Sequence, residues 1–402
     1  MSTAETLADE LGLTGWLREA VLAVPRQEFA PGTGWAAPAR GPGYPIDRAA
    51  RPREWLRAVF SDAAVVTQWE DGPTDPGEVD PLRSPASSSL SAPGIAFGFL
   101  DLLAPRPGDR VLEIGTGTGY TAAVLAERVG GGSVTSIEVD PAVAAQAAEN
   151  LKRARYAPHL VVGDGAQGHP GGAPFDRVHA TCAVRRIPGA WVAQSRPGGA
   201  IVAPWQPGHD WGWMVRLTAD GEGAAHGRLH GRSGYMMLRG QRTEMRFRQH
   251  HREDADISTT ELDPRSIADG GDGAELAITA LAPDIKLIPR TGGDGAFTLA
   301  LYEMGGPGGS WAVCEHSPGA DRFEVAQYGA RRLWDEAEAA YLRWVGAGSP
   351  DAERFGLTVG ADGRHRVWLD SPRNPGALPD GLPTCSDDRA CRQQPGPSIR
   401  KG

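Results

Sequence analysis

Short apolar runs alternate with helical patterns through the first half of the chain. The run 111–114 leads into glycines and then into a helical pattern over 120–129. A second run, 133–137, precedes a helical pattern over 141–155, and the proline at its start suits a first helical turn. Two more apolar runs predict core strands, at 178–180 and 200–203. Strands and helices that alternate at this spacing indicate a mostly parallel sheet covered by helices.

The segments before these strands have a weaker pattern. Residues 5–30 predict a helix followed by a Val-Pro-Arg turn, and 31–54, rich in Gly, Pro and Arg, predict an irregular loop. The run 63–69 predicts a strand or extended segment, and the polar residues 70–88 predict a surface loop. A helix is expected over 95–103.

The pattern changes after about residue 215. Short strand-like runs appear at 297–302, 311–314 and 323–326, and helical spacing follows over 330–345. The runs 355–359 and 364–369 flank Gly-Ala-Asp-Gly, which predicts a hairpin. The sequence thus predicts an α/β domain with a doubly wound, Rossmann-like sheet over 1–215. It also predicts a glycine-rich linker over 216–234, a smaller α+β domain over 235–370 and a disordered Pro-rich tail over 371–402.

The glycine turn after the first core strand carries the strongest chemical signal. Gly115, Gly117 and Gly119 form G-x-G-x-G, Glu113 lies two residues ahead, and Glu138 ends the next strand. Such a strand–loop–helix–strand unit holds a nucleoside-bearing cofactor, with the carboxylate on the ribose hydroxyls. A dinucleotide would bring its pyrophosphate close to Glu113, where like charges repel. A cationic cofactor without phosphate, such as S-adenosylmethionine, suits the site better. A dinucleotide, or a turn with no ligand, is the alternative.

Several motifs, taken in order, resemble the protein-L-isoaspartate O-methyltransferase family over roughly residues 10–215. The matching segments are 23–29, 89–93, 111–120, 137–138, 163–165, 173–178 and 196–199. The resemblance implies a class I methyltransferase sheet and S-adenosylmethionine, which leaves as S-adenosylhomocysteine. The implied cofactor-binding residues are Glu113, Gly115, Thr116, Gly117, Gly119, Tyr120, Glu138, Asp164 and Gly165. Glu138 would bind the ribose and Asp164 the adenine amino group; a surface carboxylate and a simple Gly-Asp-Gly turn are the alternatives.

The resemblance also points to the substrate side. Methyl transfer to a carboxylate needs little acid–base help, because the carboxylate is already ionised at neutral pH. A hydroxyl that orients it is enough, and the resemblance gives this role to Ser91, with Ser89 beside it. Alternatively, both serines merely cap the next helix. The expected substrate-binding residues are Pro93, Thr181, Cys182, Arg185 and Arg186. The chain departs from the family at Gly94 and over 181–186, which affects the expected specificity.

Charge and composition exclude several functions. The net charge of −9 argues against a nucleic-acid backbone as partner, and no apolar run is long enough to span a membrane. The N-terminus is polar and lacks a signal-peptide core, so a cytoplasmic protein is expected. The four cysteines are widely spread and predict neither a disulfide framework nor a zinc site; pairing of Cys385 with Cys391 is the alternative. No metal is expected at His250 and His251.

Two further features stay open. The basic run Arg239, Arg242, Arg246, Arg248, His250 and His251 either receives an acidic peptide or forms a solvated face. The twelve tryptophans, Trp205, Trp211 and Trp213 among them, are expected in the core.

The predicted activity is esterification of an Asp or isoAsp carboxylate in a peptide or protein, leading to aspartimide or isoaspartate. The extra length resembles family members that tailor ribosomal peptide natural products, lanthipeptides and graspetides, and favours a modified precursor peptide as the partner. General repair of isoaspartate is the alternative. A non-catalytic module that binds cofactor and peptide is a weaker one.

Overall fold

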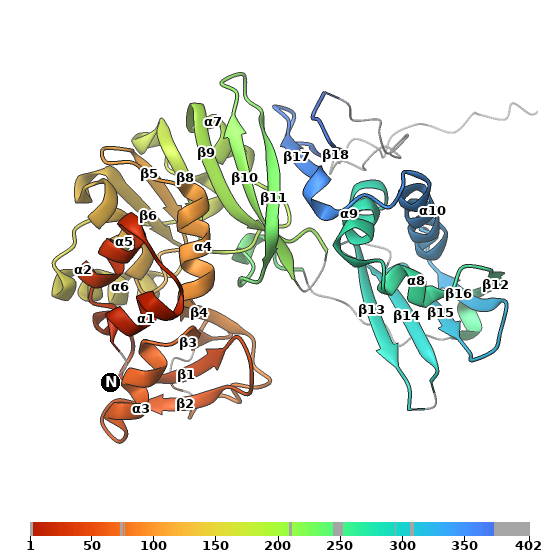
Figure 1. Cartoon of the computed structure of the whole chain (residues 1–402), viewed down its shortest axis with the longest axis horizontal. Coiled ribbons are helices and arrows are strands. Elements are labelled where there is room, and N and C mark those ends of the chain that lie inside the picture. The colour runs from red at the N-terminus through yellow and green to blue at the C-terminus, as the bar shows by residue number, and fades with distance from the viewer. Residues whose placement is uncertain are drawn as a thin grey trace, which may run out of the picture.

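Three β-sheets and their covering helices make up the part of the chain that the structure describes (Figure 1). The structure is a computed structural model, and it describes residues 3–72, 75, 77–208, 211–243, 252–293, 295–305 and 309–373. No helix in these ranges is long and apolar enough to cross a membrane.

The central sheet has nine strands. They are β5 (Val111–Ile114), β6 (Val134–Glu138), β7 (His159–Val162), β8 (Phe175–Ala180), β9 (Ser195–Trp205), β10 (Gly212–Ala219), β11 (Ala225–Ser233), β17 (Phe355–Val359) and β18 (His365–Leu369). Their order is β18-β17-β11-β10-β9-β8-β5-β6-β7. The five strands from β9 to β7 are parallel, as the alternation of strands and helices predicts, and the other four are antiparallel.

The parallel half contains a topological switch point. The chain proceeds from β5 outward to β6 and β7, then returns to place β8 on the other side of β5. Ligands of doubly wound sheets bind outside the carboxyl ends of the strands at such a point. Gly115 follows β5 and Thr181 follows β8, so the predicted glycine turn and the segment 181–186 meet at this place.

Helices cover both faces of the parallel strands. They are α4 (Pro93–Leu103), α5 (Tyr120–Val129), α6 (Pro141–Ala154) and α7 (Gly189–Ala193). Side chains alternate along a strand, so neighbouring residues enter different cores. Val111 packs in one apolar cluster with residues of α4 and α5, whereas Leu112 and Ile114 pack in the other with Trp191 of α7.

A small antiparallel sheet lies beside the substrate loop. Its strands are β1 (Thr33–Pro38), β2 (Tyr44–Asp47), β3 (Ala63–Trp69) and β4 (Ala86–Leu90), in the order β2-β1-β3-β4. Of the three helices in the first 60 residues, α3 (Pro52–Val59) contacts β2 and β3, whereas α1 (Ala4–Glu10) contacts α2 (Gly15–Ala23), and α2 contacts α5. The predicted irregular loop at 31–54 therefore contains β1 and β2. Their Gly- and Pro-rich sequence shows no clear alternation of apolar and polar residues. β1 forms because it pairs with β3, where Trp35 lies opposite Val66.

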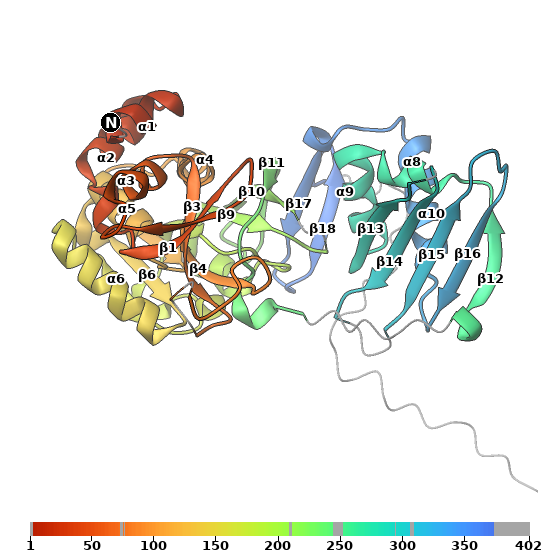
Figure 2. The same ribbon diagram turned by 90° about the horizontal axis from the view of Figure 1, so that it is seen from below.

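The C-terminal domain is α+β, as predicted, with an antiparallel sheet and helices on one face (Figure 2). Its strands are β12 (Asp256–Thr260), β13 (Ile285–Thr291), β14 (Phe297–Glu303), β15 (Trp311–His316) and β16 (Phe323–Tyr328). Its helices are α8 (Pro264–Ala268), α9 (Gly271–Leu281) and α10 (Leu333–Gly346). Leu299, Cys314 and Val325 are fully buried in the apolar cluster that Trp334 of α10 shares. α9 also contacts β18, which joins this domain to the central sheet.

The predicted domain boundaries differ from the observed ones. The stretch 216–234, expected as a linker, contains β11, a strand inside the central sheet. Its glycines allow close pairing: a Cβ on Gly227 would collide with the carbonyl oxygen of Arg216 on β10. The hairpin β17–β18, expected in the C-terminal domain, pairs with β11 instead. The predicted tail 371–402 lies outside the described residues beyond residue 373.

Candidate cofactor and substrate site

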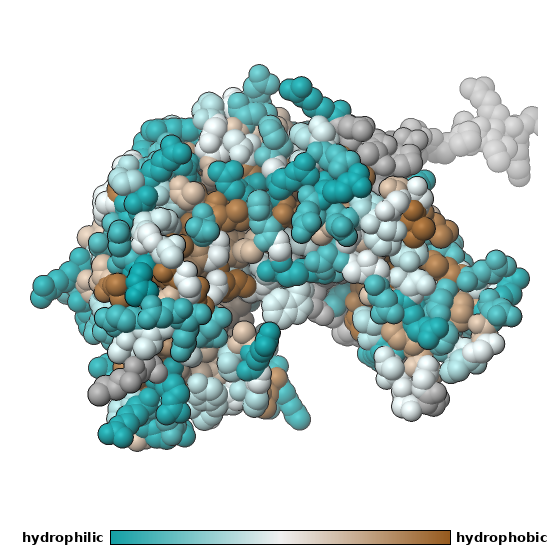
Figure 3. Space-filling model, in the orientation of Figure 1, coloured by the Kyte–Doolittle hydropathy of each residue, from teal (hydrophilic) through white to brown (hydrophobic). Residues whose placement is uncertain are grey.

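A cavity of about 670 Å³ lies at the switch point of the central sheet. Its walls come from the carboxyl ends of β5, β6 and β8, the β4–α4 loop, the small sheet and the segment after β11. The face in Figure 3 is hollowed between the part that carries β1 to β4 and the C-terminal domain. Lining residues predicted from the sequence are Ser89, Ser91, Gly115, Thr116, Gly117, Tyr120, Glu138, Gly165, Thr181 and Cys182. The fold thus brings cofactor-side and substrate-side predictions into one space.

The glycine turn needs glycine for both conformation and space. Gly115 and Gly117 have φ values of 90° and 54°, a region that other residues rarely adopt. A Cβ on Gly115 would lie 2.6 Å from the hydroxyl oxygen of Thr181, and one on Gly117 would lie 3.2 Å from the carbonyl oxygen of Ser89. The turn therefore packs directly against both the β4 end and the β8 end. Gly119 has a φ of 87° and is the N-cap residue of α5.

Glu138 lines the part of the cavity that is predicted to bind the cofactor. Its side chain is buried, and its two oxygens accept hydrogen bonds from the backbone N–H groups of Gly117, at 3.0 Å, and Asp140, at 3.1 Å. Each carboxylate oxygen has a second lone pair, so Glu138 can still accept from hydroxyls of a ligand. The carboxylate thus holds the glycine turn and lines the cavity at once.

Glu113 is not among the residues that line the cavity. It is fully buried and accepts a 2.6 Å hydrogen bond from the Ser136 hydroxyl, which in turn contacts the Thr116 hydroxyl at 2.6 Å. Glu113 lies outside the cavity because side chains alternate along a strand: Ile114 faces the cavity, and Glu113 faces the other side of β5. Glu113 therefore supports the glycine turn from the opposite side.

Asp164 is exposed and accepts a 2.9 Å hydrogen bond from the N–H of Ala166. Of the Gly-Asp-Gly motif, Gly165 alone lines the cavity. A Cβ on Gly165 would lie 2.5 Å from Ile114, so this glycine allows close packing at the end of β5.

The buried side chain of Arg26 holds the backbone of Ser91 in place. Arg26 donates to the carbonyl oxygens of Ser91 and Val59, each at 2.9 Å, and its guanidinium lies 4.9 Å from the centre of the Tyr120 ring. Arg26 is only 1% exposed, which is rare for arginine. It belongs to the motif 23–29, but only the fold shows that it positions Ser91. Pro93 begins α4 and does not line the cavity.

The segment after β8, residues 181–186, lines the cavity with its first residues and contacts the C-terminal domain with its last ones. Thr181 donates to the carbonyl oxygen of Ile114. Burial raises the pKa of the Cys182 thiol to about 12, so the thiol stays protonated at neutral pH. Arg185 and Arg186 do not line the cavity: they pair with Asp284 of the C-terminal domain at 2.5 and 3.7 Å.

Residues 234–242 form one wall of the cavity and were not predicted as part of it. Arg239 pairs with Asp140 and Asp71, each at 3.0 Å, and Arg242 pairs with Asp71 at 2.7 Å. Burial opposes ionisation of Asp140, but hydrogen bonds from Gln68, the backbone of Val143 and Arg239 outweigh it and lower its pKa to about 2. These two arginines of the basic run are thus ion-paired at the rim. The other members, Arg246, Arg248, His250 and His251, lie outside the described residues.

The three tryptophans singled out from the sequence have different places. Trp205 and Trp213 are buried in the core, as expected. The expectation was wrong for Trp211, which is 62% exposed and lines the cavity mouth. Its ring lies against Gly234, where a Cβ would come within 2.7 Å.

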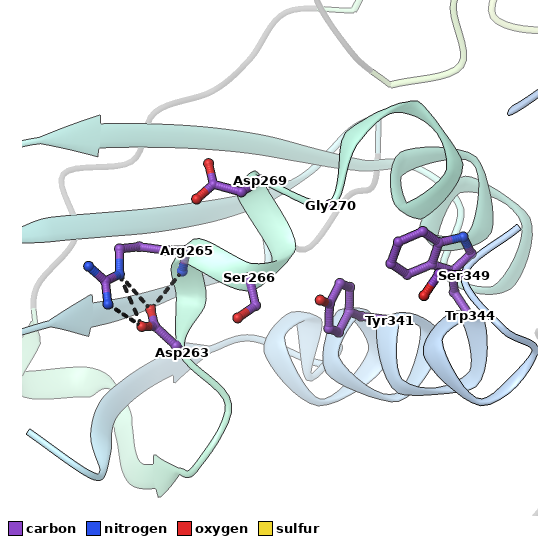
Figure 4. A pocket seen from close by; sticks show the side chains of 8 residues that line it. All are labelled: Asp263, Arg265, Ser266, Asp269, Gly270, Tyr341, Trp344 and Ser349. Atoms are coloured by element: carbon purple, nitrogen blue, oxygen red, sulfur yellow. Dashed lines mark hydrogen bonds and ion pairs between the residues drawn. The ribbon is translucent and has the colours of Figure 1, made fainter. Parts of the chain in front are cut away.

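A second, open hollow of about 530 Å³ lies in the C-terminal domain between α8 and α10 (Figure 4). Of its three charged residues, Asp263 and Arg265 bind each other, and Asp269 is the third. Tyr341 and Trp344 form its aromatic side, with ring centroids 5.6 Å apart. No group of three or more His, Cys, Asp and Glu in the described ranges could hold a metal ion. The cavity at the switch point is therefore the better candidate for chemistry.

His365 connects the hairpin β17–β18 to the loop after β8, and it gives a testable pH dependence. Its Nε2 accepts a 2.8 Å hydrogen bond from the N–H of Ile187. Burial, together with the charge of Arg186, lowers its pKa from 6.5 to about 4. Between these values the unfolded chain takes up the proton that the folded chain refuses, so stability falls as the pH falls.

We expect the wild-type protein to lose about 1 to 2 kcal/mol more free energy of unfolding between pH 7 and pH 5 than the variant His365→Gln. Glutamine keeps a hydrogen-bond acceptor but does not titrate. Urea unfolding of both proteins at each pH measures the difference. Parallel pH dependences of the two proteins would show that His365 does not carry this effect.

Comparison with known proteins identifies the family of this chain. The family model described as protein-L-isoaspartate(D-aspartate) O-methyltransferase matches residues 57–241. The chain is 35% identical to protein-L-isoaspartate O-methyltransferase of Methanopyrus kandleri over 246 residues, which are 59% of this chain and 91% of the relative. It is 32% identical to protein-L-isoaspartate O-methyltransferase 2 of Archaeoglobus fulgidus over 240 residues, again 59% and 91%.

A solved structure supports the fold. A structure named protein-L-isoaspartate O-methyltransferase aligns with 92% of this chain and with all of that chain, at 23% identity and a TM-score of 0.52. An alignment of this length extends into the C-terminal domain, so a second domain also accompanies a protein of that name. The chain belongs to the protein-L-isoaspartate(D-aspartate) O-methyltransferase family and is an S-adenosylmethionine-dependent carboxyl O-methyltransferase.

Proposed function

We propose that this enzyme esterifies the carboxylate of an L-isoaspartyl residue in a protein or peptide, as a repair methyltransferase. One observation carries the proposal: the glycine turn and the β4–α4 loop form one cavity, where Gly117 packs against the Ser89 carbonyl and Ser91 lies two residues further on. Relatives named for this activity, aligned over nine-tenths of their own length, support it.

The cavity fits S-adenosylmethionine. Glu138 has free lone pairs for ribose hydroxyls, and Ile114, Ile137 and Val139 supply apolar surface for a base. The cationic side chains among the described lining residues, Arg239 and Arg242, are paired with aspartates and offer no free charge to a pyrophosphate. When bound, S-adenosylmethionine supplies a methyl group on a positively charged sulfur and leaves as S-adenosylhomocysteine.

The residues of the chain position the acceptor and exclude competing reactions. A substrate carboxylate is ionised at neutral pH and needs no general base. The Ser91 hydroxyl can donate a hydrogen bond to one carboxylate oxygen and thereby orient the other. Cys182 lines the same cavity, but its protonated thiol is a poor nucleophile, so it does not compete for the methyl group.

The ester prepares the next reaction, which needs no further residue of the enzyme. The backbone nitrogen that follows in the substrate attacks the ester carbonyl, the new C–N bond closes a succinimide, and methanol leaves with the amide proton. Hydrolysis of this aspartimide yields Asp and isoAsp, so repeated cycles restore Asp.

A second candidate is the tailoring of a ribosomal peptide natural product, with a modified precursor peptide as substrate. The observation that favours it is the link from the cavity to the C-terminal domain, where Arg185 and Arg186 of the segment after β8 bind Asp284. This segment and Gly94 are also the places where the sequence departs from the family. The second domain alone does not distinguish the candidates, because the aligned structure of the same name also extends over it.

The test is methyl transfer from labelled S-adenosylmethionine to matched peptides that differ only in Asp or isoAsp, read by mass spectrometry. We expect the isoAsp peptide to be methylated and the Asp peptide to stay unmodified. Methylation of the Asp peptide alone would contradict repair and support tailoring. No methylation of either peptide, with measurable cofactor binding, would also contradict general repair.

A further inference from the structure

Three segments around the cavity meet at the side chain of Arg239. This arginine belongs to the wall segment 234–242, Gln68 lies in β3, and Asp140 is the N-cap residue of α6. The Arg239 Nη2 donates to Oδ2 of Asp140 at 3.0 Å and to the amide oxygen of Gln68 at 3.1 Å. The Gln68 amide nitrogen donates to the same Oδ2 at 3.0 Å. Each of these three side chains therefore contacts the other two.

Burial makes the contact of Arg239 with Asp140 difficult to replace by water. Gln68 is 3% exposed and Asp140 is 7% exposed. Arg239 also pairs through its Nε with Oδ1 of Asp71, at 3.0 Å, in the loop after β3. One cation thus offsets two carboxylates from different segments. Its removal would leave the buried Asp140 carboxylate without a positive partner, which is costly.

Asp140 links Arg239 to the Glu138 carboxylate. One oxygen of Asp140 accepts from the N–H of Ala142 at 2.8 Å, and the other accepts from Arg239. Both oxygens are therefore fixed, and the backbone N–H of Asp140 is held with them. This N–H donates to Oε1 of Glu138 at 3.1 Å, while the N–H of Gly117 holds Oε2 at 3.0 Å. The orientation of Glu138 in the cavity thus depends on the place of Asp140.

We propose that Arg239 is a positioning residue for the cofactor: by fixing Asp140, it orients the Glu138 carboxylate toward the ribose hydroxyls of S-adenosylmethionine. The inference rests on the proposed contact between Glu138 and the ribose, but it does not depend on which peptide is methylated. Because Arg239 acts through Glu138, its effect should disappear when either Glu138 or the ribose hydroxyls are removed.

The experiment measures the Kd for S-adenosylhomocysteine by calorimetry, which needs no peptide substrate. Arg239→Met keeps an apolar stem of similar length and removes the guanidinium. We expect the Kd to rise about 5- to 10-fold, because a misoriented acceptor loses about the net value of one hydrogen bond. Arg239→Gln, which keeps a polar but uncharged side chain, is the second variant and should show the same rise.

The matched control is Arg196→Met. It also removes an arginine from an ion pair, at 2.8 Å to Asp176, and Arg196 does not line the cavity. Its Kd for S-adenosylhomocysteine should equal that of the wild type. Urea unfolding of all variants shows that the compared proteins are folded.

Two further measurements separate positioning from a general structural effect. In a Glu138→Ala background, Arg239→Met should change the Kd less than about twofold, because residues that act as a unit are not additive. The second measurement changes the ligand and keeps Glu138. The 2′,3′-dideoxy analogue of S-adenosylhomocysteine lacks both ribose hydroxyls, so wild type and Arg239→Met should bind it with equal Kd.

An unchanged Kd for S-adenosylhomocysteine in both Arg239 variants would contradict this inference alone. An equal loss of affinity for the dideoxy analogue would also contradict it, because general damage to the wall would then explain the loss. A wild type that binds the analogue as tightly as S-adenosylhomocysteine would contradict the proposed ribose contact. A wild type that methylates neither peptide would contradict the proposed function, and the Kd comparison would still test Arg239.

Discussion

Replacing Glu138 by alanine should raise the Kd for S-adenosylmethionine about 100-fold. Two ribose hydroxyls would lose an ionised acceptor, and hydrogen bonds to charged groups contribute about 1.5 to 3 kcal/mol each, so a loss of about 3 kcal/mol is expected. The substitution also leaves the N–H groups of Gly117 and Asp140 without their carboxylate partner, which loosens the glycine turn. Isothermal titration calorimetry of the free enzyme measures the change directly.

The control is Glu149→Ala, which removes an exposed carboxylate from α6, the helix that begins after Glu138. It should bind the cofactor as the wild type does. A Glu138→Ala variant that keeps wild-type affinity would show that the cofactor does not use this carboxylate.

Replacing Ser91 by alanine should lower kcat about 100-fold and leave the Kd for S-adenosylmethionine nearly unchanged. The hydroxyl orients a carboxylate, and loss of orientation affects the rate of methyl transfer rather than cofactor affinity. The backbone of the loop should stay in place, because Arg26 holds the Ser91 carbonyl oxygen and not its side chain. Single-turnover transfer of labelled methyl to the isoAsp peptide measures this step.

Ser84→Ala is the control for this second prediction, since Ser84 precedes β4 and does not line the cavity. A Ser91→Ala variant with full activity would remove Ser91 from the orienting role. A different outcome would support a non-catalytic binding module. In that case the wild type would bind cofactor and peptide without methyl transfer, and Ser91→Ala would not change either binding affinity.

The cofactor side was predictable because its determinants are local. The strand, the glycine turn and the next strand lie within about 30 residues, and each needs a residue type that the sequence shows directly. Glu113 shows the limit of this reasoning. Its place two residues before Gly115 is close in sequence, but strand alternation turns it away from the cavity, toward Ser136.

The substrate side was only partly predictable because distant segments build it. Ser91 follows from a motif, whereas Arg26, which lies 65 positions earlier in the sequence, reaches the Ser91 carbonyl only through the fold. Trp211 carries no local signal that separates it from the buried Trp213 two residues later. β11 was missed for a related reason: its glycines are typical of a turn, and only the close approach of β10 shows why a strand needs them.

The position of β17 and β18 in the central sheet determines which truncations of the protein can fold. Because these strands pair with β11, the segment from β12 to α10 is an insertion within the central sheet and is not appended after it. A stop codon before residue 355 would expose the ladder groups of β11 and create a new sheet edge, which favours aggregation. An internal deletion that keeps the hairpin and bridges the two points of insertion is the route to a minimal catalytic unit. Fusion partners and purification tags therefore belong at the chain ends and not at the apparent domain boundary.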